Sequence, residues 1–208
     1  MNLITEQYEK QTARWPTEGQ HILAQYDAES IVVYQAYRPS IGQFAIANGY
    51  LGGPDFSLSR MSWIKPNFLW MMYRAGWATK EGQEVILGLR IRRTFFDALL
   101  EAAVASSFEA SGMADRAVWQ EAAQGSDVRL QWDPDHSPAG DMLNRRAVQL
   151  GLRGDTLRVF AKSELLEVID MSDFVAAQRQ HIHDWRTLMT PREEVYVPAA
   201  LSAGEGDR

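Results

Sequence analysis

One segment of the chain is apolar on almost every face of the helix that it predicts. It begins at Pro66, runs to Ala75 and stops at Gly76. Its aromatic and methionine side chains fill two stripes at helical spacing, where a surface helix would have one. Such a helix is stable only when other elements cover it, so the sequence predicts a globular fold around a buried central helix.

The length of the chain is sufficient for that fold. A chain of 208 residues buries roughly 70% of its unfolded surface without disulfide or metal support. We therefore expect one globular domain over residues 1–198, followed by a flexible tail over residues 199–208 that is small and polar. Cysteine is absent, which excludes disulfides, zinc–thiolate sites, iron–sulfur clusters and cysteine nucleophiles.

Hydrophobic patterning predicts strands and helices in mixed order. The expected strands cover residues 20–26, 31–37, 61–64, 85–91, 128–132, 146–152, 165–169 and 194–197. The expected helices cover residues 39–49, 66–75, 94–106, 114–123, 155–162 with Asp155 as cap, and 172–188 with Ser172 as cap. Because no regular strand–helix–strand alternation runs through this order, the fold class is α+β, with packed helices and a mixed, mostly antiparallel sheet.

Charge is distributed unevenly along the chain. The net charge is −6, yet residues 60–93 alone carry +5. The N-terminus has no basic stretch followed by an apolar one, and the longest central apolar run is far shorter than the ~20 residues of a membrane span. We expect a soluble, cytoplasmic protein without a membrane partner.

Basic and aromatic side chains gather at the start of the central helix. Arg60, Trp63 and Lys65 precede it, and Arg74 lies within it. An arginine on so apolar a helix requires a carboxylate, a carbonyl or a ligand. The combination suits an anionic ligand that carries a ring, such as a nucleotide, and equally suits single-stranded nucleic acid. Ordinary solvated charge is the alternative for Arg60 and Lys65.

A second polar group follows a predicted strand, where Asp133, Asp135 and His136 lie close together. Two carboxylates and an imidazole could hold a metal for phosphoester hydrolysis. Asp-Pro-Asp is also a common turn sequence. Glycine-rich dinucleotide loops, phosphate loops and the serine elbow are absent, which argues against the enzyme classes that depend on them.

Long tryptophan-rich motifs resemble one known family, called domain of unknown function 4291. The resemblance covers nearly the whole chain, from Tyr26 to Val197. It is carried by residues 34–39, 60–77, 131–136, 145–154 and 169–175. The family label implies no established chemistry.

A second resemblance links the strand and helix around Pro39 to ADP-ribosyltransferase-like domains. It implies a split sheet, NAD as cofactor, and Gln35 or Arg38 on the first strand. Ser62 matches the next catalytic position, and Glu164 or Glu167 would have to serve as the third, which has no clear match in the sequence. With Arg38 or Arg60 on the pyrophosphate and Trp63 on a ring, the chain would transfer ADP-ribose to a nucleotide or nucleic acid. The alternative is a non-catalytic module that binds RNA, another single strand or a nucleotide.

Overall fold

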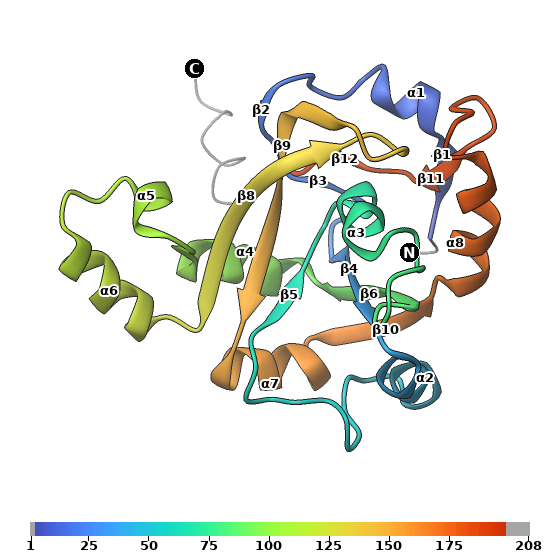
Figure 1. Cartoon of the computed structure of the whole chain (residues 1–208). Coiled ribbons are helices and arrows are strands. Elements are labelled where there is room, and N and C mark those ends of the chain that lie inside the picture. The colour runs from blue at the N-terminus through green and yellow to red at the C-terminus, as the bar shows by residue number, and fades with distance from the viewer. Residues whose placement is uncertain (1–2, 199–208) are drawn as a thin grey trace.

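The computed structural model describes residues 3–198, and the expected tail over residues 199–208 lies outside this range. Within these residues there are eight helices, and Figure 1 shows them arranged around the strands. The helices are α1 (Tyr8–Thr12), α2 (Pro39–Asn48), α3 (Phe68–Ala75), α4 (Arg93–Ala102), α5 (Phe108–Ser111), α6 (Arg116–Gly125), α7 (Gly154–Lys162) and α8 (Ser172–Gln178). A short 3-10 turn, Arg179–His181, follows α8.

The strands form two main sheets. The first is antiparallel in the order β10 (Leu165–Asp170), β6 (Val85–Arg92), β4 (Ser30–Tyr37). The second has the order β2 (Gly19–Gln20), β9 (Met142–Leu152), β8 (Val128–His136), β7 (Val104–Ala105), with β5 (Ser62–Ile64) also paired to β9. Two small sheets pair β1 (Thr5–Gln7) with β11 (Met189–Pro191), and β3 (Leu23–Ala24) with β12 (Glu194–Val195). The fold is α+β in one domain with mostly antiparallel pairing, as the sequence predicts.

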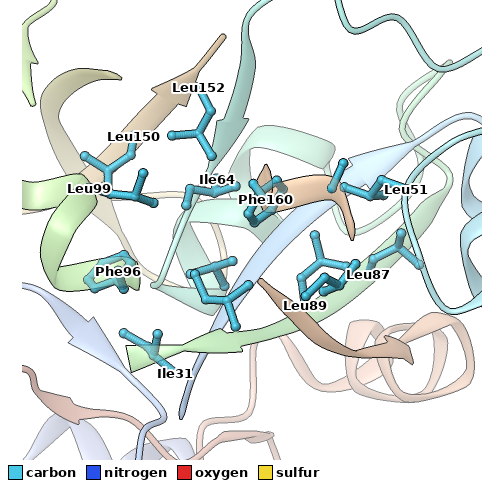
Figure 2. Close-up of a cluster of buried hydrophobic side chains, with 14 of the residues drawn as sticks. Ile31, Leu51, Ile64, Leu87, Leu89, Phe96, Leu99, Leu150, Leu152 and Phe160 are labelled. Atoms are coloured by element: carbon cyan, nitrogen blue, oxygen red, sulfur yellow. The ribbon is translucent and has the colours of Figure 1, made fainter. Parts of the chain in front are cut away.

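The main core lies between the two sheets. Alternate residues of β4, such as Ile31 and Val33, face it because successive side chains in a strand point to opposite faces. Phe96 of α4 and Phe160 of α7 fill it from the helices, and both are fully buried (Figure 2). This layer holds the two sheets together.

The opposite face of the first sheet is covered by the central helix. Val32 and Tyr34 of β4 point to that face and pack in one cluster with Phe68 and Met72 of α3. Helix α3 ends at Gly76, which adopts a left-handed conformation with φ of 56°. The predicted burial of this helix is therefore confirmed for most of its side chains.

A buried carboxylate fixes the start of α3. Glu193 accepts a hydrogen bond from the Phe68 backbone N–H at 2.7 Å and one from the Asn67 amide at 3.2 Å. Asn67 in turn accepts from the Trp70 N–H at 2.6 Å, as an N-cap residue does. Burial, together with nearby Asp135, raises the pKa of Glu193 well above its ordinary value of 4.5.

Glu193→Gln is expected to change how stability depends on pH. The folded state holds the Glu193 proton more tightly than the unfolded state, so the wild-type free energy of unfolding falls as pH rises above 4.5. The glutamine variant lacks this loss, and its stability relative to wild type rises with pH. Urea unfolding at several pH values measures the difference. Glu194→Gln, an exposed neighbour, is the control, and identical profiles for the two variants would contradict the expectation.

Several predicted boundaries are wrong because pairing with distant strands overrides local preference. The strand expected over 20–26 is divided between β2 and β3, which pair with different partners. The helix expected over 94–106 ends at Ala102, because β7 pairs with β8. The helix expected over 172–188 ends at Gln178, since its side chain accepts from the Met189 N–H where that residue joins β11. The residues that follow form turns that lead to β11.

Two predicted helix caps also differ from the structure. Met171, rather than Ser172, is the N-cap of α8, and Asp170 accepts from the Ser172 N–H at 2.9 Å. Asp155 lies in the first turn of α7, and it is Asp127 that accepts from the backbone there. Within residues 3–198, no helix combines the length and the hydropathy that crossing a bilayer requires.

Candidate functional site

A cavity of the described chain lies where the two sheets meet. Its volume is about 880 Å³, within the range usual for small-molecule sites. The C-terminal end of β4, the strand β5, the last turn of α3 and the paired strands β8 and β9 form its walls. Residues of the loop between α2 and β5 also line it. We call this cavity the inter-sheet pocket.

Most residues that the sequence singles out lie in this pocket. Seven of the nine residues proposed for catalysis or cofactor binding line it: Gln35, Arg38, Arg60, Ser62, Trp63, Lys65 and Arg74. The two glutamates do not. Glu167 pairs with Arg90 at 2.7 Å and Glu164 with Arg92 at 3.3 Å, both across the β10–β6 side of the first sheet. Neither of the glutamates expected at the third position therefore lines the pocket.

A hydrogen-bonded network joins β4 to β5 at the pocket wall. The Gln35 amide nitrogen donates to Ser62 Oγ at 2.7 Å and to the Trp63 carbonyl at 3.1 Å. The Tyr37 hydroxyl donates to Gln35 Oε1 at 2.7 Å and lies 3.2 Å from Ser62 Oγ. Gln35 and Ser62, selected by resemblance as catalytic positions, are therefore in direct contact.

The proton positions in this network follow from the Trp63 carbonyl, which can only accept a hydrogen bond. A carbonyl only accepts, so the Gln35 nitrogen must face Trp63, and Oε1 must face Tyr37. Tyr37 then donates, and burial raises the pKa of its hydroxyl, so that it stays protonated. Ser62 Oγ already accepts from Gln35, which leaves the Ser62 hydrogen for Tyr37 Oη or for a ligand oxygen.

Lys65 is the most unusual charge in the pocket. The residue is only 5% exposed, and its side chain makes no hydrogen bond or ion pair with any residue in the described range. Burial and, to a smaller extent, nearby Arg74 lower its pKa to about 8, against the opposite effect of Asp133. Two backbone hydrogen bonds with Tyr34, at 2.7 and 3.2 Å, hold Lys65 where β4 and β5 meet.

The arginines of the pocket are exposed rather than buried. Arg74 lies on the side of the last turn of α3 that faces solvent and the pocket, so the expectation that its charge is buried is wrong. Its side chain has no ion-pair partner among residues 3–198. Arg38 and Arg60 are likewise exposed at the pocket edge. With Lys65 they give the lining four cations against the carboxylates of Asp55 and Glu81.

Sequence reasoning missed two glutamines on the far wall. Gln131 of β8 and Gln149 of β9 are register partners in the sheet and both line the pocket. Each donates from Nε2 to one oxygen of Asp133, at 2.8 and 2.7 Å. The available signal was the polar residues that alternate with apolar ones along both strands.

The group around Asp133 is neither a turn nor a metal cluster. Residues 133–136 continue β8 and pair with β9. Asp135, 1% exposed, accepts two hydrogen bonds from Arg145 at 2.8 and 2.6 Å. His136 stacks on Tyr73 with ring centroids 3.4 Å apart. Among residues 3–198, no three acidic, histidine or cysteine side chains converge as metal ligands, so the phosphoesterase hypothesis loses its ligand set.

Comparison with known proteins agrees with the main resemblance in the sequence. No curated protein matches the chain. One family model matches residues 21–196, a range that contains every residue named above for the pocket. The chain therefore belongs to the family described as Domain of unknown function (DUF4291).

Proposed function

We propose that the inter-sheet pocket binds a phosphorylated nucleoside, with NAD as the first ligand to test. The observation that carries this proposal is Lys65, which is only 5% exposed, lines the pocket and forms no ion pair with any residue between 3 and 198. An unpaired buried charge destabilises a fold, and a bound phosphate would compensate it. Arg38, Arg60 and Arg74 surround the same pocket with donors suited to phosphate oxygens.

The remaining lining fits the other half of such a ligand. Trp63 offers an aromatic surface, and the Ser62 hydroxyl offers one hydrogen to an acceptor oxygen. A volume of about 880 Å³ leaves room for more than a bare phosphate. Phosphate donors and an aromatic surface in one pocket support a nucleotide over an inorganic anion.

We propose that the bound NAD transfers its ADP-ribose to a nucleotide or nucleic acid, with nicotinamide as the leaving group. Breaking the bond between nicotinamide and ribose leaves positive charge on the sugar, which a carboxylate can stabilise. Glu164 and Glu167 lie outside the pocket lining, whereas Asp55 and Glu81 are part of it. Asp55 or Glu81, rather than Glu164 or Glu167, is therefore the carboxylate that we propose to stabilise this charge.

Binding of single-stranded RNA without turnover is the second candidate. Arg38, Arg60 and Arg74 are exposed beside Trp63, and cations beside an aromatic ring are what unpaired bases and phosphates require. This candidate predicts an affinity that falls steeply with salt. It also predicts that no nicotinamide is released.

Calorimetry with the full chain tests the two candidates. We expect heat of binding with NAD and with ADP-ribose, and release of nicotinamide from NAD detected by chromatography. Binding of a short RNA alone would favour the second candidate. No binding of NAD, ADP-ribose, ATP or pyrophosphate at millimolar concentration would overturn the proposal.

NAD affinity is expected to depend on pH through Lys65. Below about 8 the ammonium group is charged and attracts phosphate, and above that pH it is progressively lost, so the dissociation constant rises. Lys65→Arg keeps its charge over this range and should give a flat profile. Calorimetric titrations between about pH 7 and about pH 9 check this, and a parallel rise in both proteins would assign the effect to another group.

A further inference from the structure

The amide of Gln149 is held in one orientation by the carboxylate behind it. Gln149 Nε2 donates to Asp133 Oδ2 at 2.7 Å, and Gln131 Nε2 donates to Asp133 Oδ1 at 2.8 Å. A carboxylate at neutral pH only accepts, so the nitrogen of Gln149 must face it. The amide cannot exchange its oxygen and nitrogen without losing this hydrogen bond.

The rest of that amide is available to a ligand. Gln149 Oε1 makes no hydrogen bond to another residue within the range 3–198, and one of the two Nε2 hydrogens is also unused. An acceptor and a donor therefore stand side by side on one planar group that lines the pocket. Gln131 differs, because its Oε1 already accepts from Ser106 at 3.2 Å.

An aromatic ring lies beside this amide. Trp63 of β5 is the register partner of Gly151 in β9, two residues beyond Gln149. A Cβ atom at Gly151 would lie 3.0 Å from two atoms of the Trp63 ring, so the ring rests directly against that position. Because side chains two residues apart share one face of a strand, the ring and the amide are on the same side of β9.

We propose that Trp63 and Gln149 form a base-binding subsite that selects adenine, with Asp133 as the positioning residue. Adenine would stack on Trp63, donate its amino hydrogen to Gln149 Oε1 and accept at a ring nitrogen from Nε2, the pairing by which glutamine reads adenine in DNA. A hypoxanthine ring places a carbonyl oxygen where adenine has its amino group. That oxygen would face Oε1, and the fixed amide cannot turn to accommodate it.

This inference rests on the proposed nucleotide ligand, and a paired comparison separates the two. We would measure binding of ATP against inosine triphosphate, and of NAD against its hypoxanthine counterpart, by calorimetry with the full chain. The wild-type protein is expected to prefer the adenine ligand roughly 5- to 150-fold. In Asp133→Asn the asparagine can present either its oxygen or its nitrogen, so the Gln149 amide is no longer held in one orientation. This variant should therefore show a smaller preference for the adenine ligand.

Two variants and one phosphate probe complete the test. Gln149→Leu should remove the preference for adenine and leave the affinity for pyrophosphate unchanged, while Gln43→Leu, exposed on α2, should change neither. Equal binding of adenine and hypoxanthine ligands to wild type would overturn the subsite and leave the proposed function standing. Failure of every phosphorylated ligand to bind would overturn both. The wild-type comparison requires no variant to fold.

Discussion

Lys65→Met is expected to weaken NAD binding and, at the same time, to stabilise the unliganded protein. A hydrogen bond to a charged group contributes about 1.5–3 kcal/mol, so the dissociation constant should rise by one to two orders of magnitude. The free protein should gain stability at neutral pH, because methionine fills similar volume and removes a buried charge that forms no ion pair within residues 3–198. Calorimetry and urea unfolding measure the two changes.

The opposite signs of these two changes make the experiment informative. A lysine with only a structural role would lose stability on replacement, and its loss of binding would follow from damage to the fold. Lys10→Met is the control, because Lys10 is exposed on α1, away from the pocket. A Lys65→Met protein that is less stable than wild type and still binds NAD normally would refute the role that we assign to Lys65.

Arg145→Met is expected to give the largest loss of stability in the described chain, about 3–5 kcal/mol. The guanidinium group is buried, pairs with Asp135 and donates to the Pro16 carbonyl at 2.6 Å. It also lies over the Trp15 ring, 5.3 Å from its centre. Removing it leaves the Asp135 carboxylate, only 1% exposed, without its counter-charge. Urea unfolding of the variant measures this cost.

Two further variants show whether the cost comes from the unpaired charge. Arg145→Met combined with Asp135→Leu removes both charges and should recover much of the lost stability, since apolar pairs often replace buried ion pairs without loss. Arg158→Met breaks an exposed pair with Asp155 and should cost less than about 1 kcal/mol. Equal losses for Arg145→Met and Arg158→Met would contradict the expectation.

Local sequence signals predicted the fold wherever the local preference and the distant partners agree. The strand expected over residues 31–37 forms as β4, because its side chains alternate between the two hydrophobic clusters. Ile31 and Val33 belong to one cluster, and Val32 and Tyr34 belong to the other. The helix from Pro39 to Asn48 begins and ends at its proline and at Gly49, both of which act within one turn. These elements depend on their own residues and need no information from elsewhere.

The errors concern residues whose structure is decided far along the chain. Asp133 to His136 has the composition of a turn, yet pairing with β9 keeps it in a strand. Arg145 then neutralises Asp135, ten residues away in sequence. Glu164 and Glu167 are candidates only because the resemblance implies a carboxylate, and no local pattern indicates that Arg90 and Arg92 pair with them.

The pocket was predicted more fully on its cationic side than on its polar wall. Arginine, lysine and tryptophan in one segment form a recognisable pattern, so Arg60, Trp63 and Lys65 were found together. The role of Gln149 depends on Asp133, and that contact requires the β8–β9 register. A glutamine in an alternating strand is indistinguishable from any other exposed polar residue until the strands are paired.

The capping of α3 by Glu193 has a consequence for synthesis on the ribosome. The helix emerges early, yet the carboxylate that accepts from its first N–H is translated 125 residues later. The Trp15 indole N–H likewise donates to the Glu193 carbonyl, which lies 178 residues later in the sequence. Contacts of such sequence separation slow folding and leave apolar surface open to chaperones until residue 193 has been translated. A nascent chain stalled before residue 193 would contain α3 without the Glu193 side chain that accepts from its first N–H.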